Sequence, residues 1–284
     1  MNLDLIKLSH YNIPHLVEDS KNDWVSFGED NLYPNYLLEL FLGSAINGAL
    51  VKSIGAMIYG EGLAATNVDE STDTKESYLR LTELLHNSDD DFGEPQLKYL
   101  DFPNCKQIFT QNMNVRHPKV KPLPIGMANH CWKWGDSKVM DEVINEGYID
   151  SNPYFIYANF TKGDGVRCER RKDCYDILSE NGIIMQESTD YKSYLQELKK
   201  HKFCLSPEGN GIDCYRTWEA LYMKTIPICK RSVMVEEFAK IFPIYIVDDW
   251  KDFDIDDVWN SYDSFNWDNW YKLDFETYCR EIEL

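Results

Sequence analysis

The sequence predicts an α/β protein whose C-terminal part, residues 152–284, is a Rossmann-like domain with a complete parallel sheet. From residue 152 onward, short apolar runs alternate with helical stretches, which is typical of βαβ units. One connecting loop, residues 206–213, carries two glycines and leads directly into a predicted helix. The composition is 43% hydrophobic and 14% aromatic, which is enough for a packed core and excludes a disordered chain.

The N-terminal segment, residues 1–75, is expected to be helical. One or two apolar helices are predicted over residues 36–59, and Gly60 and Gly62 would end the second of them. The stretch 67–75, NVDESTDTK, is polar and charged and has the composition of a linker.

Residues 76–151 predict a partial α/β domain. Residues 79–85 form either a strand or a short helix, and the runs 106–111 and 121–125 predict short strands. Two prolines confine the last of these strands to a sheet edge or a strand end.

The pattern of residues 152–284 is regular. Strands are predicted at residues 154–158, 183–186, 202–205, 226–229 and 244–247, and helices at 170–180, 190–200, 214–223 and 233–241, before an acidic C-terminal region with further helices. Parallel sheets bind ligands beyond the carboxyl ends of their strands. We therefore expect the loops 159–169 and 206–213 to line one crevice.

Charge, cysteine pattern and hydropathy restrict the class of protein. The formal net charge of -19 argues against nucleic acid as the main partner. The eight cysteines form no CxxC pair, so no zinc site is predicted, and we expect buried thiols in a reducing compartment. The first 20 residues lack the features of a signal peptide, and no stretch predicts a transmembrane span. We expect a soluble, cytoplasmic protein.

The stretch most informative about chemistry is residues 202–230, KFCLSPEGNGIDCYRTWEALYMKTIPICK. Without side chains at Gly209 and Gly211, the backbone N–H groups of the loop could approach an anion, which the start of the next helix would also attract. Arg216 and Glu219 share one helical face, where they could bind the diphosphate and the ribose of a nucleotide. A surface ion pair between Arg216 and Glu219 is the alternative.

The segment LSPEGNGIDCYRTWEALYMKTIPI resembles the signature of exostosin-like glycosyltransferases. The resemblance implies donor-binding roles for the loop and for the helix that follows it, carried by Ser206, Gly209, Asn210, Gly211, Asp213, Arg216 and Glu219. At Met223-Lys224 the sequence departs from the Leu-Gly that the family often has. Because lysine adopts a left-handed turn less readily than glycine, we expect a turn of different shape there.

The resemblance extends upstream and covers about residues 84–270. Residues 99–135 are similar to a family segment with a strand, a Gln-Asn pair and a Pro-x-Pro-Ile-Gly run, and residues 86–89 resemble a His-Asn-Ser-Asp motif. The resemblance implies a GT-B-like architecture, in which two Rossmann-like domains face each other across a cleft. It also implies an inverting transfer without a metal or other cofactor, with residues 76–151 as the acceptor side.

Further site residues follow from charge and position. The segment 159–172 is locally basic, and within it Asn159, Lys162 and Arg170 are expected at the donor, with Lys162 or Arg170 at its phosphates; a solvated helix start is the alternative. An inverting transfer needs a base, for which Asp89 and His86 are candidates, although residues 89–91 could also be an ordinary solvated loop. Asp254-Ile255-Asp256 predicts a helix start and not a metal site.

The front of the chain does not fit a transferase. Residues 76–151 are too few for a complete acceptor domain, so that domain is expected to be truncated. Residues 24–63 resemble the start of tailed-phage portal proteins, with an Asp-Asn-Leu-Tyr-Pro entry and a Gly-x-Gly-Leu exit. The resemblance suggests a phage or virus gene fusion or a chimeric reading frame, in a bacterium or a virus-infected host cell; an unrelated helical lead-in is the alternative. Two functions compete: a transferase acting on a nucleotide sugar and a hydroxyl acceptor, or a phage structural or interaction protein with a relic or binding-only transferase domain.

Overall fold

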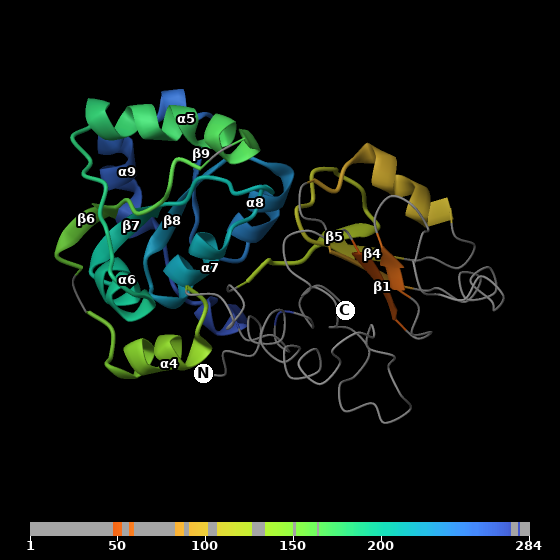
Figure 1. Ribbon diagram of the computed structural model, residues 1–284, viewed down its shortest axis with the longest axis horizontal. Coiled ribbons are helices and arrows are strands. Elements are labelled where there is room, and N and C mark those ends of the chain that lie inside the picture. Colours follow the sequence, from red (N-terminus) through yellow and green to blue (C-terminus); the bar gives the residue numbers. More distant parts are fainter. Residues whose placement is uncertain are drawn as a thin grey trace.

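The computed structural model describes residues 48–52, 57–59, 83–87, 91–101, 107–126, 134–149, 152–163, 165–273 and 278. They form two sheets, each at the centre of its own unit (Figure 1). The first unit contains β1 to β5 and the second unit contains residues 134–273. Within these described ranges, no helix has the length and hydropathy needed to cross a membrane.

The first sheet has the strand order β2-β1-β3-β4-β5. Its strands are β1 (Gly48–Lys52), β2 (Met57–Tyr59), β3 (Glu83–Asn87), β4 (Gln107–Thr110) and β5 (Val120–Pro122). β3, β4 and β5 run parallel, and β1 is antiparallel to both β2 and β3. A 3-10 helix, η1 (Glu94–Asp101), lies between β3 and β4.

The expectation of helices over residues 36–59 is wrong for β1 and β2. Leu50 of β1 pairs with Leu85 of β3, and Val51 pairs with Leu84, so apolar residues of two distant segments meet in one sheet. Tertiary pairing of this kind overrides local helix preference. The sheet also crosses the boundary expected near residue 75, and it gains two strands that residues 76–151 do not supply.

The second sheet has four parallel strands in the order β6-β7-β8-β9. They are β6 (Tyr154–Tyr157), β7 (His201–Leu205), β8 (Ile226–Lys230) and β9 (Tyr245–Val247). The helices of this unit are α4 (Ser137–Asn145), α5 (Gly165–Glu180), α6 (Tyr191–Leu198), α7 (Tyr215–Tyr222), α8 (Val233–Ala239) and α9 (Ile255–Ser261). The predicted alternation of strands and helices is confirmed, with one exception at residues 183–186. This stretch forms no strand, although the Gln186 N–H donates to the Ala158 carbonyl at 2.7 Å.

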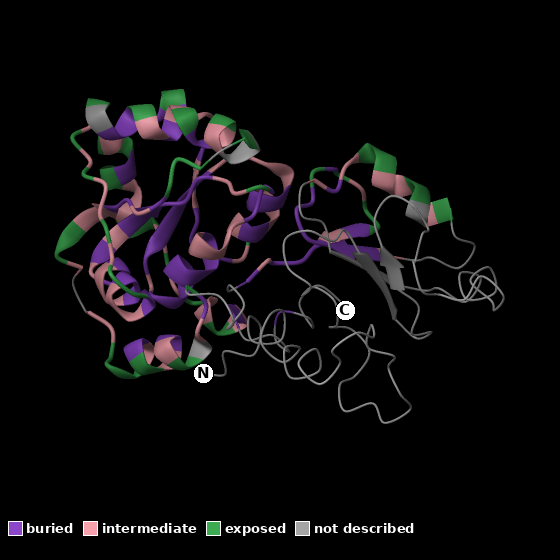
Figure 2. Ribbon diagram, viewed as in Figure 1, coloured by how far each residue is buried: buried purple, intermediate pink, exposed green. Residues whose placement is uncertain are grey.

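The core of the second unit lies on both faces of its sheet. Phe203 and Leu205 of β7 face a cluster that includes residues of α5 and α9, whereas Cys204 between them faces a cluster with α6, α7 and α8. Figure 2 shows the buried strands between these helical layers. Burial on both faces explains why residues 203–205 of β7 and 226–229 of β8 form continuous apolar runs in the sequence.

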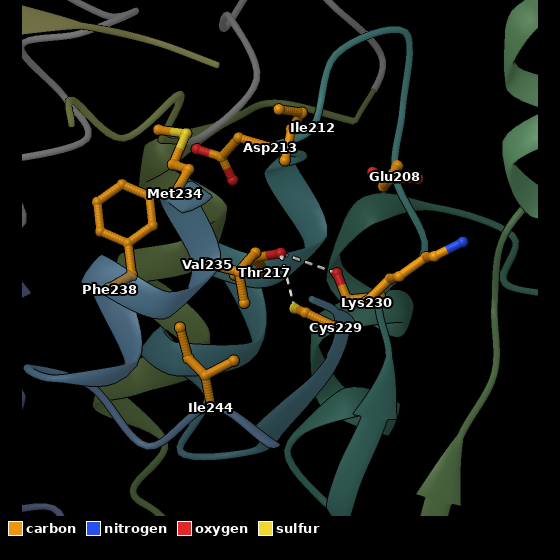
Figure 3. Close-up of a pocket in the computed structure, with 11 residues that line it drawn as sticks. Glu208, Ile212, Asp213, Thr217, Cys229, Lys230, Met234, Val235, Phe238 and Ile244 are labelled. Atoms are coloured by element: carbon orange, nitrogen blue, oxygen red, sulfur yellow. Dashed lines mark hydrogen bonds between the residues drawn. The ribbon is translucent and has the colours of Figure 1, made fainter. Parts of the chain in front are cut away.

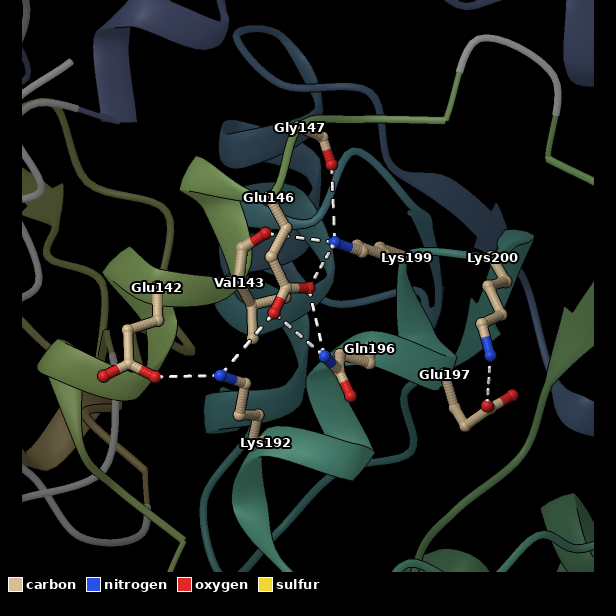
Figure 4. A network of polar contacts seen from close by, with 9 residues as sticks. All are labelled: Glu142, Val143, Glu146, Gly147, Lys192, Gln196, Glu197, Lys199 and Lys200. Carbon is tan, nitrogen blue, oxygen red and sulfur yellow. Dashed lines mark hydrogen bonds and ion pairs between the residues drawn. The ribbon is translucent and has the colours of Figure 1, made fainter.

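Hydrogen bonds and ion pairs join α4 to α6 in a contact that we call the α4–α6 brace (Figure 4). Lys199, at the end of α6, is only 8% exposed. Its ammonium donates to the Val143 and Gly147 carbonyls at 3.1 and 3.4 Å and to the Glu146 carboxylate at 3.1 Å. The partially exposed pairs Lys192–Glu142 and Gln196–Glu146 flank it. Because the lysine is buried, its three acceptors are needed to offset desolvation.

The turn between α7 and β8 is left-handed in spite of its lysine. Lys224 has a φ of 56°, so the expectation that this turn would depart from the left-handed form is wrong. The Lys224 ammonium lies 4.7 Å from the ring centroid of Tyr148 and 5.0 Å from that of Trp270. Cation–π attraction to two rings offsets the backbone strain of a non-glycine residue here.

A C-terminal residue packs against both units. Tyr278 is fully buried, and its ring stacks on Phe242 with centroids 6.3 Å apart. Its hydroxyl donates to the Pro122 carbonyl at the end of β5, at 3.0 Å. The first sheet is therefore held in part by the end of the described chain.

Candidate functional site

Two loops follow neighbouring strands at the carboxyl edge of the second sheet. Residues 159–163 leave β6 and residues 206–213 leave β7. Arg171 of α5 joins them, because its Nε donates to the Glu208 carbonyl at 2.8 Å and its Nη1 donates to the Thr161 carbonyl at 2.7 Å. The two loops expected to line one crevice therefore lie side by side. Sequence reasoning counted Arg171 only as part of a basic segment.

Arg216 occupies the first turn of α7 and points toward the loop after β6. Its Nε donates to the Asn159 carbonyl at 3.0 Å, and its guanidinium lies 5.6 Å from the Phe160 ring centroid. Its Nη1 is buried and has no hydrogen-bond partner. Among the described residues, no ion pair includes Arg216, so the alternative of a surface pair with Glu219 is wrong. A buried guanidinium with a bare N–H group is suited to bind an anion.

Glu219 lies one helical turn after Arg216 and is 6% exposed. Its two carboxylate oxygens accept hydrogen bonds from the hydroxyls of Tyr191 at 3.1 Å and Tyr194 at 2.8 Å. Burial raises the pKa of Glu219, while the Tyr194 hydroxyl and the Arg216 charge act against this rise. Each oxygen keeps a further lone pair, so the carboxylate is oriented and can still accept from a sugar hydroxyl.

The tyrosines that orient Glu219 were missed by the sequence analysis. Tyr191 and Tyr194 are three residues apart in α6 and therefore share one face. Burial raises the pKa of both hydroxyls well above the usual range, which keeps them neutral donors. The sequence feature that could have indicated these tyrosines is Asp190, the N-cap of α6. It fixes where the helix begins and therefore which of its residues share a face.

A polar cluster lies at the end of β6, next to Arg216. The Asn159 amide donates to the Tyr157 hydroxyl at 2.8 Å and to the Ser188 hydroxyl at 3.1 Å. Asn159 was predicted as a site residue, and it lies beside Arg216 through its carbonyl. The structure thus brings together Asn159, Arg216 and Glu219 at one edge of the sheet.

The loop 206–213 forms hydrogen bonds with itself and with the protein around it. The Ser206 hydroxyl lies 2.9 Å from that of Thr217, and the Gly209 N–H donates to the Gly211 carbonyl at 3.0 Å, so it does not point to an anion. Asn210 is exposed. A Cβ built on Gly209 would meet only ordinary contacts, so its lack of a side chain is not required by packing.

Asp213 is a structural residue in this loop. Its carboxylate accepts from the N–H groups of Ile125 at 2.7 Å and Cys214 at 2.8 Å, and from the Trp218 indole at 2.9 Å. Burial raises the pKa of Asp213 to about 7, and these N–H donors oppose the rise. Each of its two carboxylate oxygens already accepts two hydrogen bonds from the protein. The structure therefore gives no support to the donor-binding role predicted for Asp213.

A small pocket opens on the other side of α7 (Figure 3). Ser206, Glu208 and Lys230 give it a polar rim, and its remaining lining includes Val235, Phe238 and Ile244. Lys230 pairs with Asp249 at 2.8 Å. The pocket lies between α7 and α8, whereas Arg216 and Glu219 face the end of β6 and α6, so the pocket is separate from the polar cluster.

The basic residues expected at the donor phosphates have different positions. Lys162 is exposed. Arg170 pairs with Asp91, which follows β3 in the first unit, at 3.4 Å, and its Nη1 is buried without a hydrogen-bond partner. Arg170 thus spans the two units. Sequence reasoning treated Asp91 only as part of an acidic run.

The candidate bases are only partly described. His86 lies in β3 opposite Ala49 and Thr110, and only its backbone is described. Asp89 lies outside the described residues. Within the described ranges, no three potential metal ligands lie together. Asp254 caps α9 by accepting from the N–H groups of Asp256 and Asp257, which confirms a helix start.

Five cysteines are described with free thiols: Cys168, Cys174, Cys204, Cys214 and Cys229. Three of them, Cys174, Cys204 and Cys229, are buried, and burial raises the pKa of each thiol. A raised pKa keeps these thiols protonated and unreactive, as expected for core residues.

No model of a known protein family matches the chain, and no curated protein matches it either.

Proposed function

We propose that the chain is an exostosin-like glycosyltransferase that transfers a sugar from a nucleotide-diphosphate sugar to a hydroxyl acceptor, with inversion and without a metal. The observation that carries this proposal is Arg216, whose Nη1 is buried and has no partner at the carboxyl edge of a parallel sheet. Such a cation is costly to keep unless an anion pairs with it. A diphosphate is an anion that fits a guanidinium fork.

Glu219 supports a nucleotide over a simple anion. Its carboxylate is fixed by Tyr191 and Tyr194 one helical turn from Arg216. A ribose that presents its hydroxyls to Glu219 would leave the diphosphate near Arg216. The nearby amide of Asn159 and hydroxyl of Ser188 offer polar contacts for the rest of the nucleotide.

The proposed reaction is a single displacement. The acceptor hydroxyl attacks the anomeric carbon of the donor, its proton passes to a base, and the bond from that carbon to the diphosphate oxygen breaks. Arg216 stabilises the charge that develops on the leaving diphosphate. His86 and Asp89 are the proposed bases, since the end of β3 lies at the edge from which Asp91 reaches Arg170.

Calorimetric titration with uridine and guanosine diphosphates tests the site. We expect Arg216→Gln to weaken binding about 10- to 100-fold, the effect of losing a charge-assisted hydrogen bond. Arg231→Gln is the matched control, because Arg231 is exposed and pairs only at the surface. The melting temperature of each variant shows whether it is folded, so that weaker nucleotide binding by Arg216→Gln can be separated from unfolding.

Three outcomes contradict the proposal or a part of it. Unchanged affinity of Arg216→Gln would remove the assignment of the diphosphate site. Nucleotide binding without release of nucleoside diphosphate from a sugar donor, over a panel of hydroxyl acceptors, would favour the alternative of a binding-only domain in a phage structural or interaction protein. Loss of transfer on adding a chelator would contradict metal independence.

A further inference from the structure

The two units meet at a reciprocal pair of hydrogen bonds. The Asp213 N–H, in the loop after β7, donates to the Asn112 Oδ1, at the end of β4, at 2.9 Å. In return, the Ile125 N–H after β5 donates to the Asp213 carboxylate at 2.7 Å. Each unit therefore supplies one donor and one acceptor at the same place.

The contact at this junction is too close for a side chain. Asn112 is 1% exposed. A Cβ built on Gly211 would lie 2.4 Å from the Asn112 Cγ and 2.4 Å from its Oδ1, well inside any real contact. The absence of a side chain at Gly211 is therefore required by Asn112, and the loop 206–213 is shaped against a residue of the first unit.

Asn112 is itself held in one conformation. Its φ is 50°, in the left-handed region that asparagine tolerates better than most residues. Its carbonyl accepts from the Phe92 N–H at 2.8 Å. The backbone of Asn112 is thus held by a hydrogen bond within the first unit, while its side chain contacts the loop of the second unit.

Asp213 connects the junction to the candidate site. Its carboxylate accepts from the Cys214 N–H just before α7 and from the Trp218 indole within α7. Arg216 and Glu219 lie on the same helix. Asp213 therefore forms hydrogen bonds both with Asn112 and with the helix that carries Arg216 and Glu219.

We propose that Asn112 and Asp213 form a latch through which the first unit sets the conformation of the loop 206–213. Asn112 is a positioning residue in this scheme, because it contacts the loop and acts on the nucleotide only through it. The effect on affinity rests on the proposed nucleotide site, whereas the effect on the loop does not. The second unit alone is then an incomplete nucleotide-binding unit.

Hydrogen exchange of the loop amides in the full chain tests the latch directly. Asn112→Gly removes the amide while leaving the left-handed backbone unstrained, and Asn114→Gly, an exposed asparagine two residues on, is the control. We expect the Asp213 amide and its loop neighbours to exchange about tenfold faster in Asn112→Gly, because a local opening becomes easier. Asn114→Gly should leave them unchanged.

A second variant tests the close contact from the other side of the junction. Gly211→Ala should force the Asn112 side chain away and speed the same exchange. In the double variant, the new methyl group at position 211 occupies the space that the Asn112 side chain vacated, so the loop should exchange no faster than in Asn112→Gly alone. Such non-additivity is the signature of two residues in direct contact. Additive effects would overturn the latch.

Titration of the same variants with uridine and guanosine diphosphates measures the coupling to the site. The loss of one hydrogen bond should weaken binding about two- to tenfold in Asn112→Gly. Faster loop exchange with unchanged affinity would overturn the coupling, and unchanged exchange would overturn the latch itself. If the unmodified chain binds neither nucleotide, the proposed function is wrong and so is the coupling of the latch to nucleotide binding. The hydrogen-exchange result still shows whether the latch itself exists.

Discussion

Replacing Asp213 by asparagine should change how the stability of the protein depends on pH. Asp213 is 7% exposed, and burial raises the pKa of its carboxyl group from 3.8 to about 7. Asparagine has nearly the same shape but does not titrate. The difference in unfolding free energy between the two proteins therefore isolates the titration of this carboxyl group from that of other groups.

The sign and size follow from the two pKa values. Between pH 4 and 7 the folded protein binds a proton at Asp213 that the unfolded chain does not, so this group stabilises the fold at low pH and loses that contribution as pH rises through 7. Two pH units below the folded pKa, the contribution is about 3 kcal/mol. Glu146, Asp190, Glu236 and Asp249 act in the opposite direction, because their partners lower each pKa, and they cancel in the difference.

Urea unfolding at pH 5 and pH 8 measures this difference. The stability of the unmodified protein relative to Asp213→Asn should fall by about 3 kcal/mol from pH 5 to pH 8. Asp263→Asn, at an exposed position, should show no such change. A difference that is constant with pH would refute the reasoning. It would mean that the N–H groups of Ile125, Cys214 and Trp218 keep the Asp213 carboxylate ionised at pH 5.

Two further predictions concern stability, and urea midpoints check both. Lys224→Ala keeps the left-handed strain but loses the contacts with Tyr148 and Trp270, so it should destabilise by about 1 kcal/mol. Lys224→Gly loses the same ring contacts but also removes the backbone strain, so its free energy of unfolding should stay within about 0.5 kcal/mol of that of the unmodified protein. Equal losses of stability in the two variants would contradict the compensation of strain by the ring contacts. Lys199→Met removes the ammonium group at the centre of the α4–α6 brace and should lower the free energy of unfolding by about 1–3 kcal/mol. Lys200→Met, at a more exposed ion pair, should change the free energy of unfolding by roughly zero. Equal effects of these two changes would contradict a structural role for Lys199.

The second sheet could be predicted because its signals are local. Each strand contains a short apolar run, and β7, α7 and β8 follow one another within residues 201–230. The first sheet could not be predicted in full, since β1 depends on β3, more than 30 residues away, as in the pairing of Leu50 with Leu85. Residues 183–186 show the opposite error, because a strand was predicted there and none forms. The run is apolar and Gln186 forms a hydrogen bond with Ala158, but the segment does not pair with the sheet as a strand.

The site shows the same division between local and distant information. Helical spacing is a local property, so the shared face of Arg216 and Glu219 could be read from the sequence. Their partners could not, because the Glu219 carboxylate is bound by α6 and the Arg216 Nε by the loop after β6. The role of Gly211 depends on Asn112, 99 positions earlier in the chain, which no pattern within the loop reveals.

The contact of Tyr278 with Pro122 has a consequence for synthesis on the ribosome. The side chain that closes over the end of β5 is made more than 150 residues after that strand. While the chain grows, the second unit has all its strands once residue 247 has emerged, but Pro122 and Phe242 still lack the contact with Tyr278. N-terminal parts of a chain often fold first during translation. Here the contact at the end of the earlier sheet can form only after residue 278 has emerged.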